Sequence, residues 1–414
     1  MKFTDYYIVD ELKGNIDKQG FKRPTDIQFK SIPAILNGED VLAIAQTGTG
    51  KTAAFAIPII HILHSRKMLK RPDGVKCLVM APTHELALQI ETVFKTLCKK
   101  TRVTTFCIHG GVDQEPQKET LEKGVDVLIA TPGRMFDLVS QGSLDLKRVE
   151  ILVLDEADHM LDLGFIKDIK DLMRHLPKMR QTLFFSATIN EKIKKLAYSL
   201  VTNAIRIQIS PKDPVAKNIE HAVAFIEMDD KRFFLKHLLT EHPDKKTLVF
   251  VRTKVRAERV KKAMASFDIA TETLHGDKEQ KEREAVMSAF RGNNIKVLIA
   301  TDISARGIDI DNVEYVINYD LPESSEHYVH RVGRTGRGDR RGQAISFCST
   351  EEKELLKMIE DNLGKPIHRI EITKRDYEFT KTETIKKEDD WEALMKQAEV
   401  DNEAWEKKKK KRRK

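Results

Sequence analysis

The sequence lacks the features that would place it in a membrane, outside the cell or around a structural metal. None of its apolar runs approaches the roughly 18 residues that a membrane span needs. The N-terminal segment MKFTDYYIVDELKGN has no apolar signal core, so we expect no export. The four cysteines do not pair at metal-ligand spacing; they are Cys77, Cys98, Cys107 and Cys348. These absences predict a globular protein of the reducing cytoplasm, without membrane association.

The main body of the chain also lacks net charge. The whole sequence carries +8, and its last eight residues, 407–414, are all Lys or Arg. The sequence pI near 9.0 therefore describes a basic tail. Any basic groove elsewhere has to be argued from individual residues, because net charge says nothing about it.

What the sequence does have is a series of short apolar runs separated by amphipathic stretches such as EREAVMSAFRG. The runs lie at 41–45, 77–81, 104–108, 126–130, 151–154 and 182–185, and then at 222–226, 247–251, 271–274, 296–300, 315–318 and 344–347. Short β-branched runs that alternate with helical patterns indicate buried parallel strands. The sequence therefore predicts an α/β fold with two tandem parallel-sheet domains. Two prolines and a loss of periodicity indicate a linker at 209–218.

Nearly every apolar run ends in a cluster of small, polar or charged residues. Among these clusters are QTGTGKT, PTHE, HGG, TPGR, DEAD, SAT, HGD and TDISARG. Parallel sheets bind ligands at the carboxyl ends of their strands, so the pattern predicts one such site in each domain. Polar loops also follow strands where no ligand binds, and the individual motifs must decide between the two interpretations.

The segment AQTGTGKT, residues 45–52, has the context of a phosphate-binding loop, because it follows a predicted strand and precedes an apolar helix. Gly48 and Gly50 would let backbone N–H groups turn toward phosphate oxygens. Lys51 would reach the terminal phosphates, and the Thr52 hydroxyl would ligate Mg²⁺. The usual first glycine of such a loop is replaced by Ala45.

The segment VLDEADHM supplies two acids after another predicted strand. Asp155 would hold Mg²⁺, and Glu156 would orient or deprotonate the attacking water. Taken alone, the same acids are also consistent with a helix N-terminus stabilised by its dipole. The phosphate-binding loop elsewhere in the domain favours the catalytic interpretation.

The motifs GFKRPTDIQ, AQTGTGKT, PTHELA, TPGR, DEAD, SAT, ATDISARGID and HRVGRTGR occur in the order found in DEAD-box RNA helicases. The sequence resembles a small bacterial member of that family over about residues 1–370, with an added C-terminal tail. The resemblance implies two RecA-like domains, with ATP and Mg²⁺ as cofactors and RNA as the partner. The expected parts are an adenine-reading segment 1–29, an ATP-binding domain 30–208, the linker 209–218, a second helicase domain 219–370 and a charged, flexible basic tail 371–414.

The resemblance also implies a nucleotide site. Phe21 would stack on adenine with Phe3 nearby, and Gln28 would hydrogen-bond the edge of the base. The phosphates would be held by Ala45, Gln46, Thr47, Gly48, Thr49, Gly50, Lys51 and Thr52, with Thr52 and Asp155 at the metal. Gly307 and Asp309 would approach the nucleotide when the domains close. The catalytic set would be Glu156, Lys51, Asp155, Arg334 and Arg337, the two arginines acting as fingers on the γ-phosphate.

RNA would be held by backbone N–H groups, hydroxyls and arginines, which contact phosphates without reading bases. The first domain would contribute Pro82, Thr83, Gly110, Gly111, Thr131, Pro132, Gly133 and Arg134, and the second Thr253, Gly276, Gln280, Arg283 and Thr301. Ser186, Thr188, Asp158 and His330 would couple the ATP site to domain closure, while Arg331 would bridge toward SAT or hold its turn. His84 stands where the family usually has arginine, so a cation is missing there when the imidazole is neutral.

The favoured function is local RNA unwinding, in which the two domains close on ATP and one strand and reopen after hydrolysis. An ATP-gated RNA clamp remains an alternative, and the adenine-reading motif argues against a DNA translocase. The family's common roles suggest ribosomal precursors or mRNA-decay proteins as partners, and we expect a monomer. In the tail, Trp391, Leu394, Met395 and Ala398 have helical spacing, which suits either a solvated helix or a short docking face.

Overall fold

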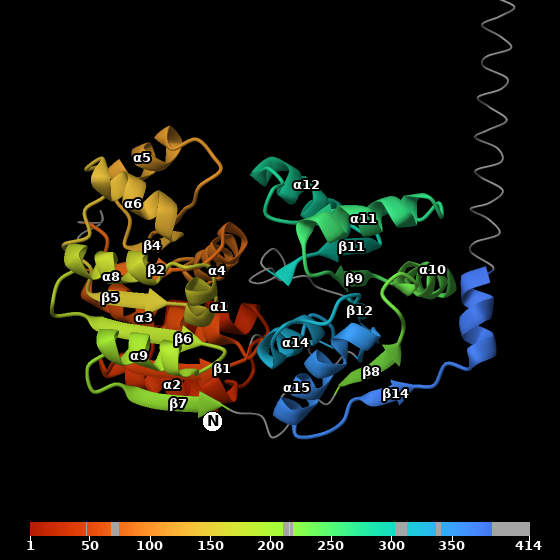
Figure 1. Ribbon diagram of the computed structural model, residues 1–414. Helices are drawn as coiled ribbons and strands as arrows, with labels where there is room; N and C mark the ends of the chain where they lie inside the picture. Colours follow the sequence, from red (N-terminus) through yellow and green to blue (C-terminus); the bar gives the residue numbers. More distant parts are fainter. Residues whose placement is uncertain are drawn as a thin grey trace, which may run out of the picture. The chain divides into compact units, whose positions relative to one another are not determined.

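The computed structural model describes residues 1–46, 48–67, 74–209, 215, 218–302, 313–336 and 341–382. The chain divides near residue 214 into two compact units, each built on a seven-stranded sheet (Figure 1). Every strand pair within the two sheets is parallel. The predicted fold of two tandem parallel-sheet domains is therefore confirmed. Within the described ranges, no helix combines the length and hydropathy needed to cross a membrane.

The first unit starts with η1 (Phe3–Asp5), α1 (Asp10–Lys18) and α2 (Asp26–Leu36). Its strands are β1 (Val41–Ala45), β2 (Cys77–Met80), β3 (Thr105–Ile108), β4 (Val127–Ala130), β5 (Ile151–Leu154), β6 (Gln181–Ser186) and β7 (Ile205–Ile209). Its remaining helices are α3 (Lys51–Arg66), α4 (His84–Leu97), α5 (Glu115–Glu122), α6 (Pro132–Ser140), α7 (Ala157–Asp162), α8 (Ile166–His175) and α9 (Glu191–Leu200). Across the sheet the strands follow the order β3-β4-β2-β5-β6-β1-β7.

The second unit repeats this strand order. Its strands are β8 (Ile219–Phe225), β9 (Thr247–Phe250), β10 (Thr271–Leu274), β11 (Val297–Ala300), β12 (Tyr315–Asn318), β13 (Gly342–Cys348) and β14 (His368–Ile370). Its helices are α10 (Lys231–Glu241), α11 (Lys254–Ala265), α12 (Gln280–Arg291), α14 (Ser325–Val332), η2 (Thr350–Glu352) and α15 (Lys353–Leu363). The order across the sheet is β10-β11-β9-β12-β13-β8-β14. Strand for strand, β8 therefore corresponds to β1, and β14 to β7.

All the predicted apolar runs are strands, with ends that shift by at most a few residues. The structure adds two strands that the sequence analysis did not identify, β7 and β14, each at an edge of its sheet. Edge strands bury less surface: β7 alternates apolar and polar residues, and β14 has only three residues. Residues 374–382, assigned to the charged tail from their sequence, are helical in the structure.

The core of the first unit lies on both faces of its sheet. Phe184 and Phe185 are consecutive in β6, so their side chains point to opposite faces. Phe185 packs with Phe55 of α3 in one buried cluster, and Phe184 joins Leu172 of α8 in the other. Burial on both faces explains why these strands appear in the sequence as continuous apolar runs.

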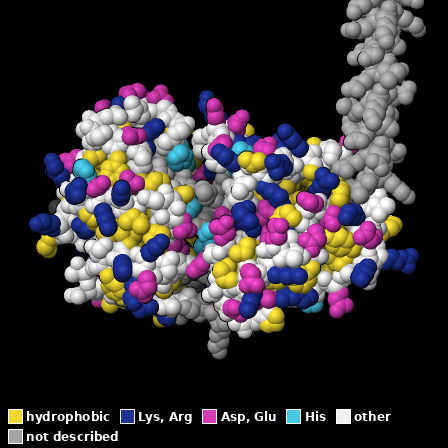
Figure 2. All heavy atoms as spheres, viewed as in Figure 1, with side chains coloured by type: hydrophobic (Ala, Val, Ile, Leu, Met, Phe, Trp, Pro, Cys, Tyr) yellow, Lys and Arg dark blue, Asp and Glu magenta, His cyan; other side chains and the backbone are white. Residues whose placement is uncertain are grey.

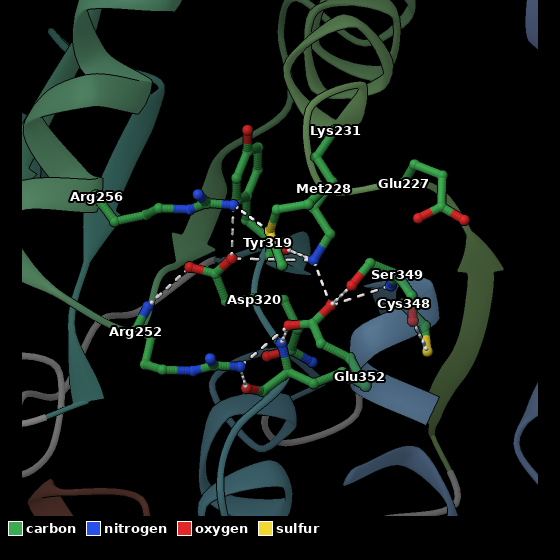
Figure 3. Close-up of polar contacts among 12 residues, drawn as sticks. Glu227, Met228, Lys231, Arg252, Arg256, Tyr319, Asp320, Cys348, Ser349 and Glu352 are labelled. Atoms are coloured by element: carbon green, nitrogen blue, oxygen red, sulfur yellow. Dashed lines mark hydrogen bonds and ion pairs between the residues drawn. The ribbon is translucent and has the colours of Figure 1, made fainter. Parts of the chain in front are cut away.

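A buried polar network anchors the start of α10 in the second unit (Figure 3). The ammonium group of Lys231 donates to the carbonyl oxygen of Tyr319 at 2.7 Å and to Glu352 Oε2 at 2.5 Å. Glu352 Oε1 also accepts a hydrogen bond from Arg252 at 3.2 Å. Burial lowers the pKa of Lys231, and the neighbouring Glu352 carboxylate opposes that effect. The network ties α10 to the ends of β12 and β13.

A second buried ion pair joins α14 to the end of β11. Arg331 is only 1% exposed, and its guanidinium contacts both carboxylate oxygens of Asp302, at 2.6 and 2.8 Å. It also donates to the carbonyl oxygen of Asp320 at 2.7 Å. Burial would raise the pKa of Asp302, but the contact with Arg331 outweighs it and holds that pKa well below its usual range. Arg331 therefore fixes α14 to the end of β11.

We predict that Arg331→Ala lowers the free energy of unfolding of the second unit by about 3 kcal/mol, because Asp302, which is largely buried, would lose its guanidinium partner and keep only the 3.6 Å contact with His327. Arg259→Ala, on the exposed face of α11, is the matched control and should change it by less than about 0.5 kcal/mol. Urea unfolding followed by circular dichroism measures both. The stabilisation from Asp302 should be complete above its unfolded pKa of 3.8 and decrease as the pH falls below it. Equal losses in the two variants would contradict the assignment.

Candidate nucleotide and RNA sites

The candidate residues of the first unit lie at one edge of its sheet, because all its strands run in the same direction. The loops after β3, β4 and β2, which are neighbours, carry Gly110, Thr131 and Pro82. The loops after β5, β6 and β1, also neighbours, carry Asp155, Ala187 and the phosphate-binding loop. The two halves meet where the backbone N–H of Asp155 donates to the carbonyl oxygen of Met80 at 3.0 Å. Residues expected to hold RNA therefore occupy one half of the edge, and residues expected to hold ATP occupy the other.

The phosphate-binding loop has the positive φ angles that its glycines allow. Gly48 and Gly50 have φ angles of 79° and 88°, in the left-handed region that favours glycine. A Cβ atom on Gly50 would lie 2.5 Å from Gln28 Nε2. Only glycine fits at this position without displacing the amide of Gln28.

Lys51 and Thr52 start helix α3 directly after this loop. The buried ammonium group of Lys51 donates to the carbonyl oxygen of Ala45 at 2.9 Å and so lies across the loop. An ammonium carries three donors, and Ala45 takes one of them. Thr49 Oγ1 donates to the carbonyl oxygen of Gln46 at 2.7 Å, which closes the turn. This donor set at a helix N-terminus fits a phosphate group. Thr47 lies outside the described residues.

Gln28 has a structural role in addition to the expected base contact. Its Oε1 accepts a hydrogen bond from the backbone N–H of Thr25 at 3.0 Å, which completes a capping box at the start of α2. Its Nε2 donates to the carbonyl oxygen of Gly50 at 3.1 Å, and Thr25 Oγ1 donates to that of Thr49 at 2.8 Å. The segment expected to read adenine is thus hydrogen-bonded to the phosphate-binding loop. The spacing TDIQ is itself a capping-box signal, which could have indicated this role from sequence.

Three aromatic residues form the candidate adenine platform. Phe21 is 37% exposed, while Phe3 and Tyr6 are buried. The ring centroids of Phe3 and Phe21 lie 6.2 Å apart, as do those of Phe3 and Tyr6. Phe3 thus lies beside Phe21, the one ring of the three that is partly exposed.

The two acids after β5 occupy an unusual environment. Asp155 is 2% exposed, and burial raises its pKa to about 7 although Lys51 acts in the opposite direction. Asp155 Oδ1 accepts a hydrogen bond from the backbone N–H of Glu156 at 3.0 Å. Glu156 has φ 50° and ψ 50°, a left-handed conformation that is strained for a residue other than glycine. A buried carboxylate that is costly to ionise suits a site where a divalent cation binds.

The expected coupling residues of the first unit are directly hydrogen-bonded to one another. Asp158 Oδ2 accepts from the backbone N–H groups of Ala187 and Thr188 at 3.1 and 3.0 Å. Ser186 Oγ donates to the carbonyl oxygen of Thr188 at 2.8 Å. The last residue of DEAD therefore holds the SAT turn. His330 lies on α14 in the second unit, where its carbonyl oxygen accepts from Arg334 Nε at 3.1 Å.

On the RNA half of the edge, helix starts and glycines predominate. Thr83 caps α4 by accepting from Leu86 N at 3.2 Å, and Thr131 precedes α6, whose first residues are Pro132 and Gly133. Gly111 has φ 76°. Such helix N-termini and open backbone are suited to phosphate groups.

Arg134 carries the one charged side chain among the residues of the first unit that are expected to contact RNA. Its Nη2 donates to the carbonyl oxygen of Val112 at 2.8 Å. Its Nη1 is buried, and no hydrogen-bond partner for it occurs among the described residues. A buried charged donor without a partner is costly, and a phosphate oxygen would satisfy it.

His84 lies among these residues as the first residue of α4. Its ring centroid is 5.2 Å from that of His109, and its Nε2 is 3.4 Å from the position of a Cβ on Gly110. The residue that departs from the family pattern is therefore next to the loop that is expected to contact RNA.

The second unit repeats the arrangement on β10, β11 and β9, which are also neighbours. The loops or helix starts after these strands carry Gly276, Thr301 and Thr253. Thr253 caps α11 by accepting from Arg256 N at 3.2 Å. Gln280 starts α12, and Arg283 follows one turn later. Gly307, Asp309 and Arg337 lie outside the described residues.

We predict that Gly50→Ala weakens nucleotide binding by at least about tenfold, equivalent to 1.4 kcal/mol, because the new Cβ displaces the Gln28 amide. Gly142→Ala is the matched control: Gly142 has φ 72° and nothing within 4 Å of an added Cβ. Both substitutions cost about 1–2 kcal/mol of backbone energy, but only the first touches the nucleotide site. Titration with a fluorescent nucleotide measures the difference. An equal effect of the two substitutions would contradict the role of the Gln28 contact.

Comparison with known proteins agrees with this geometry. Residues 25–196 match the family described as DEAD/DEAH box helicase, and residues 230–339 match the helicase conserved C-terminal domain. The chain is 42% identical over 357 residues to the DEAD-box ATP-dependent RNA helicase RhpA of Helicobacter pylori, covering 86% of this chain and 71% of that one. It is 39% identical to the ATP-dependent RNA helicase RhlB of Shewanella amazonensis, covering 91% and 86%.

Solved structures give the same result. Saccharomyces cerevisiae Dbp5 bound to RNA and ADP BeF3 superposes with a TM-score of 0.80 at 30% identity, covering 92% of this chain and 99% of that chain. Mss116 bound to ssRNA and UDP-BeF superposes with a TM-score of 0.80 at 27% identity, covering 93% and 82%. The phosphate-binding loop, the two acids and the neighbouring loops thus occur on a known scaffold, and the chain belongs to the DEAD-box ATP-dependent RNA helicases.

Proposed function

We propose that this helicase hydrolyses ATP on the β5–β6–β1 half of its first sheet and holds one RNA strand along the adjoining half. The observation that carries the proposal is the strand order, which separates the two sets of residues and joins them at Met80 and Asp155. The acids follow β5, and the neighbouring strand β2 leads into the backbone of Pro82 and Thr83 that would contact RNA. A movement of the acids would therefore reach that backbone across one strand pair. RNA is the expected partner, recognised through its backbone and largely independent of sequence.

In the ATP half, each residue has a distinct task. Phe21 and Gln28 position the adenine, and the loop from Ala45 to Lys51 holds the phosphates. Thr52 and Asp155 would hold Mg²⁺, which when bound stabilises negative charge on the phosphates. Glu156 orients the attacking water and accepts its proton. The fixed left-handed backbone at Glu156 supports this role, because strain of this kind is common where a side chain must be held in place.

The second unit completes the mechanism when it closes on the first with ATP and RNA bound. Arg334 follows α14, which the Arg331–Asp302 pair holds against β11. We infer that Arg334, with Arg337, then contacts the γ-phosphate. An arginine finger of this kind is worth about 10³–10⁵ in rate.

RNA is gripped by both units in the closed state. Thr83, Thr131 and Arg134 contact phosphates from the first unit, and Thr253 and Thr301 from the second. Closure bends the bound strand away from the A-form geometry and releases its complement. Hydrolysis reopens the two units, and Asp158, through the SAT turn, links the acids to that movement.

The test is Glu156→Gln, which keeps the side chain's shape and removes the base. ATP binding should be retained, hydrolysis should fall at least about 10²-fold, and the complex with ATP and RNA should persist longer. Glu150→Gln is the matched control, because Glu150 is an exposed acid directly before β5, at the opposite end of that strand. Single-turnover hydrolysis and RNA dissociation rates measure the outcome. Normal turnover in the Glu156 variant would remove this residue from the mechanism.

A further inference from the structure

The second unit has a cavity of about 340 Å³ beside α10, away from all the residues assigned to ATP or RNA. Its apolar lining includes Leu238 of α10, Ile345 of β13, Ile370 of β14 and Ile372, all of which are only half-buried. Figure 2 shows hydrophobic side chains reaching the surface over this part of the second unit, with acidic side chains among them. The core of the unit is therefore incompletely covered at this point.

Acidic groups surround this apolar lining. They are Glu241 at the end of α10, together with Glu371 and Asp376 in the segment after β14. The side chain of Glu241 pairs with His237, at 3.5 Å. A partner for this cavity should therefore combine an apolar face with nearby positive charge.

The corresponding end of the first sheet is covered. There, α2 packs on α3, β1 and β7. The strand order makes β8 and β14 the counterparts of β1 and β7, and α10, which follows β8, the counterpart of α3. The cavity thus lies where the first unit has a helix. The residues around it come from α10, the strands and the segment after β14.

The chain itself runs past this cavity. Residues 374–382 form a helix beside α10 (Figure 1). Tyr377 fixes it, because its hydroxyl donates to Asp230 at 2.9 Å and its ring lies 4.9 Å from that of Phe234. Asp376 and Thr380 of this helix line the cavity. The chain beyond residue 382 therefore starts next to the uncovered surface.

The following sequence contains one short segment with an apolar face. Trp391, Leu394, Met395 and Ala398 recur with the spacing of one side of a helix. Between residue 382 and Trp391 lie ETIKKEDD, which can span up to roughly 28 Å when extended. Connections of about this length commonly reverse the chain between two packed helices. Lys396 within this segment supplies one positive charge beside its apolar face, the three residues before the segment, 388–390, are acidic, and the basic run 407–414 follows further on.

We propose that residues 391–398 dock as an amphipathic helix into this cavity of their own chain, in the position that α2 occupies in the first unit. A short tether gives an effective concentration on the order of millimolar. A groove that bound the free segment with a Kd of about 0.1 mM would then be about nine-tenths occupied. The inference does not depend on the proposed mechanism of ATP hydrolysis.

The sequence offers a direct probe, because its two tryptophans are Trp391 and Trp405. In the full chain carrying Trp405→Phe, all tryptophan emission comes from Trp391. Docking predicts blue-shifted emission and weak quenching by acrylamide. Adding Leu238→Glu should shift the emission to that of a solvated tryptophan and increase quenching severalfold. Thr240→Glu, which adds the same charge to an exposed position of α10 that does not line the cavity, should change neither.

A second groove variant, Ile372→Asp, keeps the test valid if Leu238→Glu unfolds the unit, and circular dichroism checks both. A Trp391 that is solvated in the parent protein overturns the proposal. So does a Trp391 that stays equally shielded in both folded groove variants. Shielding that disappears on dilution also overturns it, because the occupant of the cavity would then be a second copy of the chain.

Discussion

The parallel pairing of the strands is the constraint on which the rest of the structure depends. Parallel strands end at the same edge, so loops that are far apart in sequence become neighbours there. In the first unit, the crossover that places β2 beside β5 brings Met80 against Asp155. Without this pairing, the PTHE loop after β2 would not lie beside the DEAD acids after β5, and the TPGR loop after β4 would not lie one strand further along. In the proposed function, the connection between the RNA and ATP sites therefore begins with one backbone hydrogen bond between two strands.

Buried ion pairs then fix the helices and loops that follow the strands. Arg331 holds Asp302 at the end of β11, and Lys231, the first residue of α10, holds Glu352 of η2. Ion pairs of this kind contribute little net stability but cost several kcal/mol when one partner is removed. Asp155 is different, since burial raises its pKa and Lys51 compensates only in part. The structural carboxylates thus have fixed partners, while the carboxylate expected at the metal is the one that is costly to ionise.

Much of the fold and most candidate residues could be predicted from the sequence, because their signals are local. Apolar runs identified the strands, and motifs such as AQTGTGKT and DEAD identified the loops between them. The Arg331–Asp302 pair could not be assigned, because nothing in the local pattern of HRVGRTGR shows which carboxylate it meets. The edge strands β7 and β14 were missed because they are short or only half-buried. The helix at 374–382 looked like charged tail, because its anchoring contacts, those of Tyr377 with Asp230 and Phe234, join residues that are far apart in the sequence. The cavity could be recognised only once the two sheets were compared.

The central claim is that ATP and RNA bind to adjoining halves of one edge and so affect each other's affinity. The most direct test measures RNA affinity with and without a non-hydrolysable ATP analogue, and then the affinity for the analogue with and without RNA. The account predicts that each ligand tightens the other by the same factor, about 5–150-fold for a coupling of 1–3 kcal/mol. Affinities that are unchanged in both directions would contradict it.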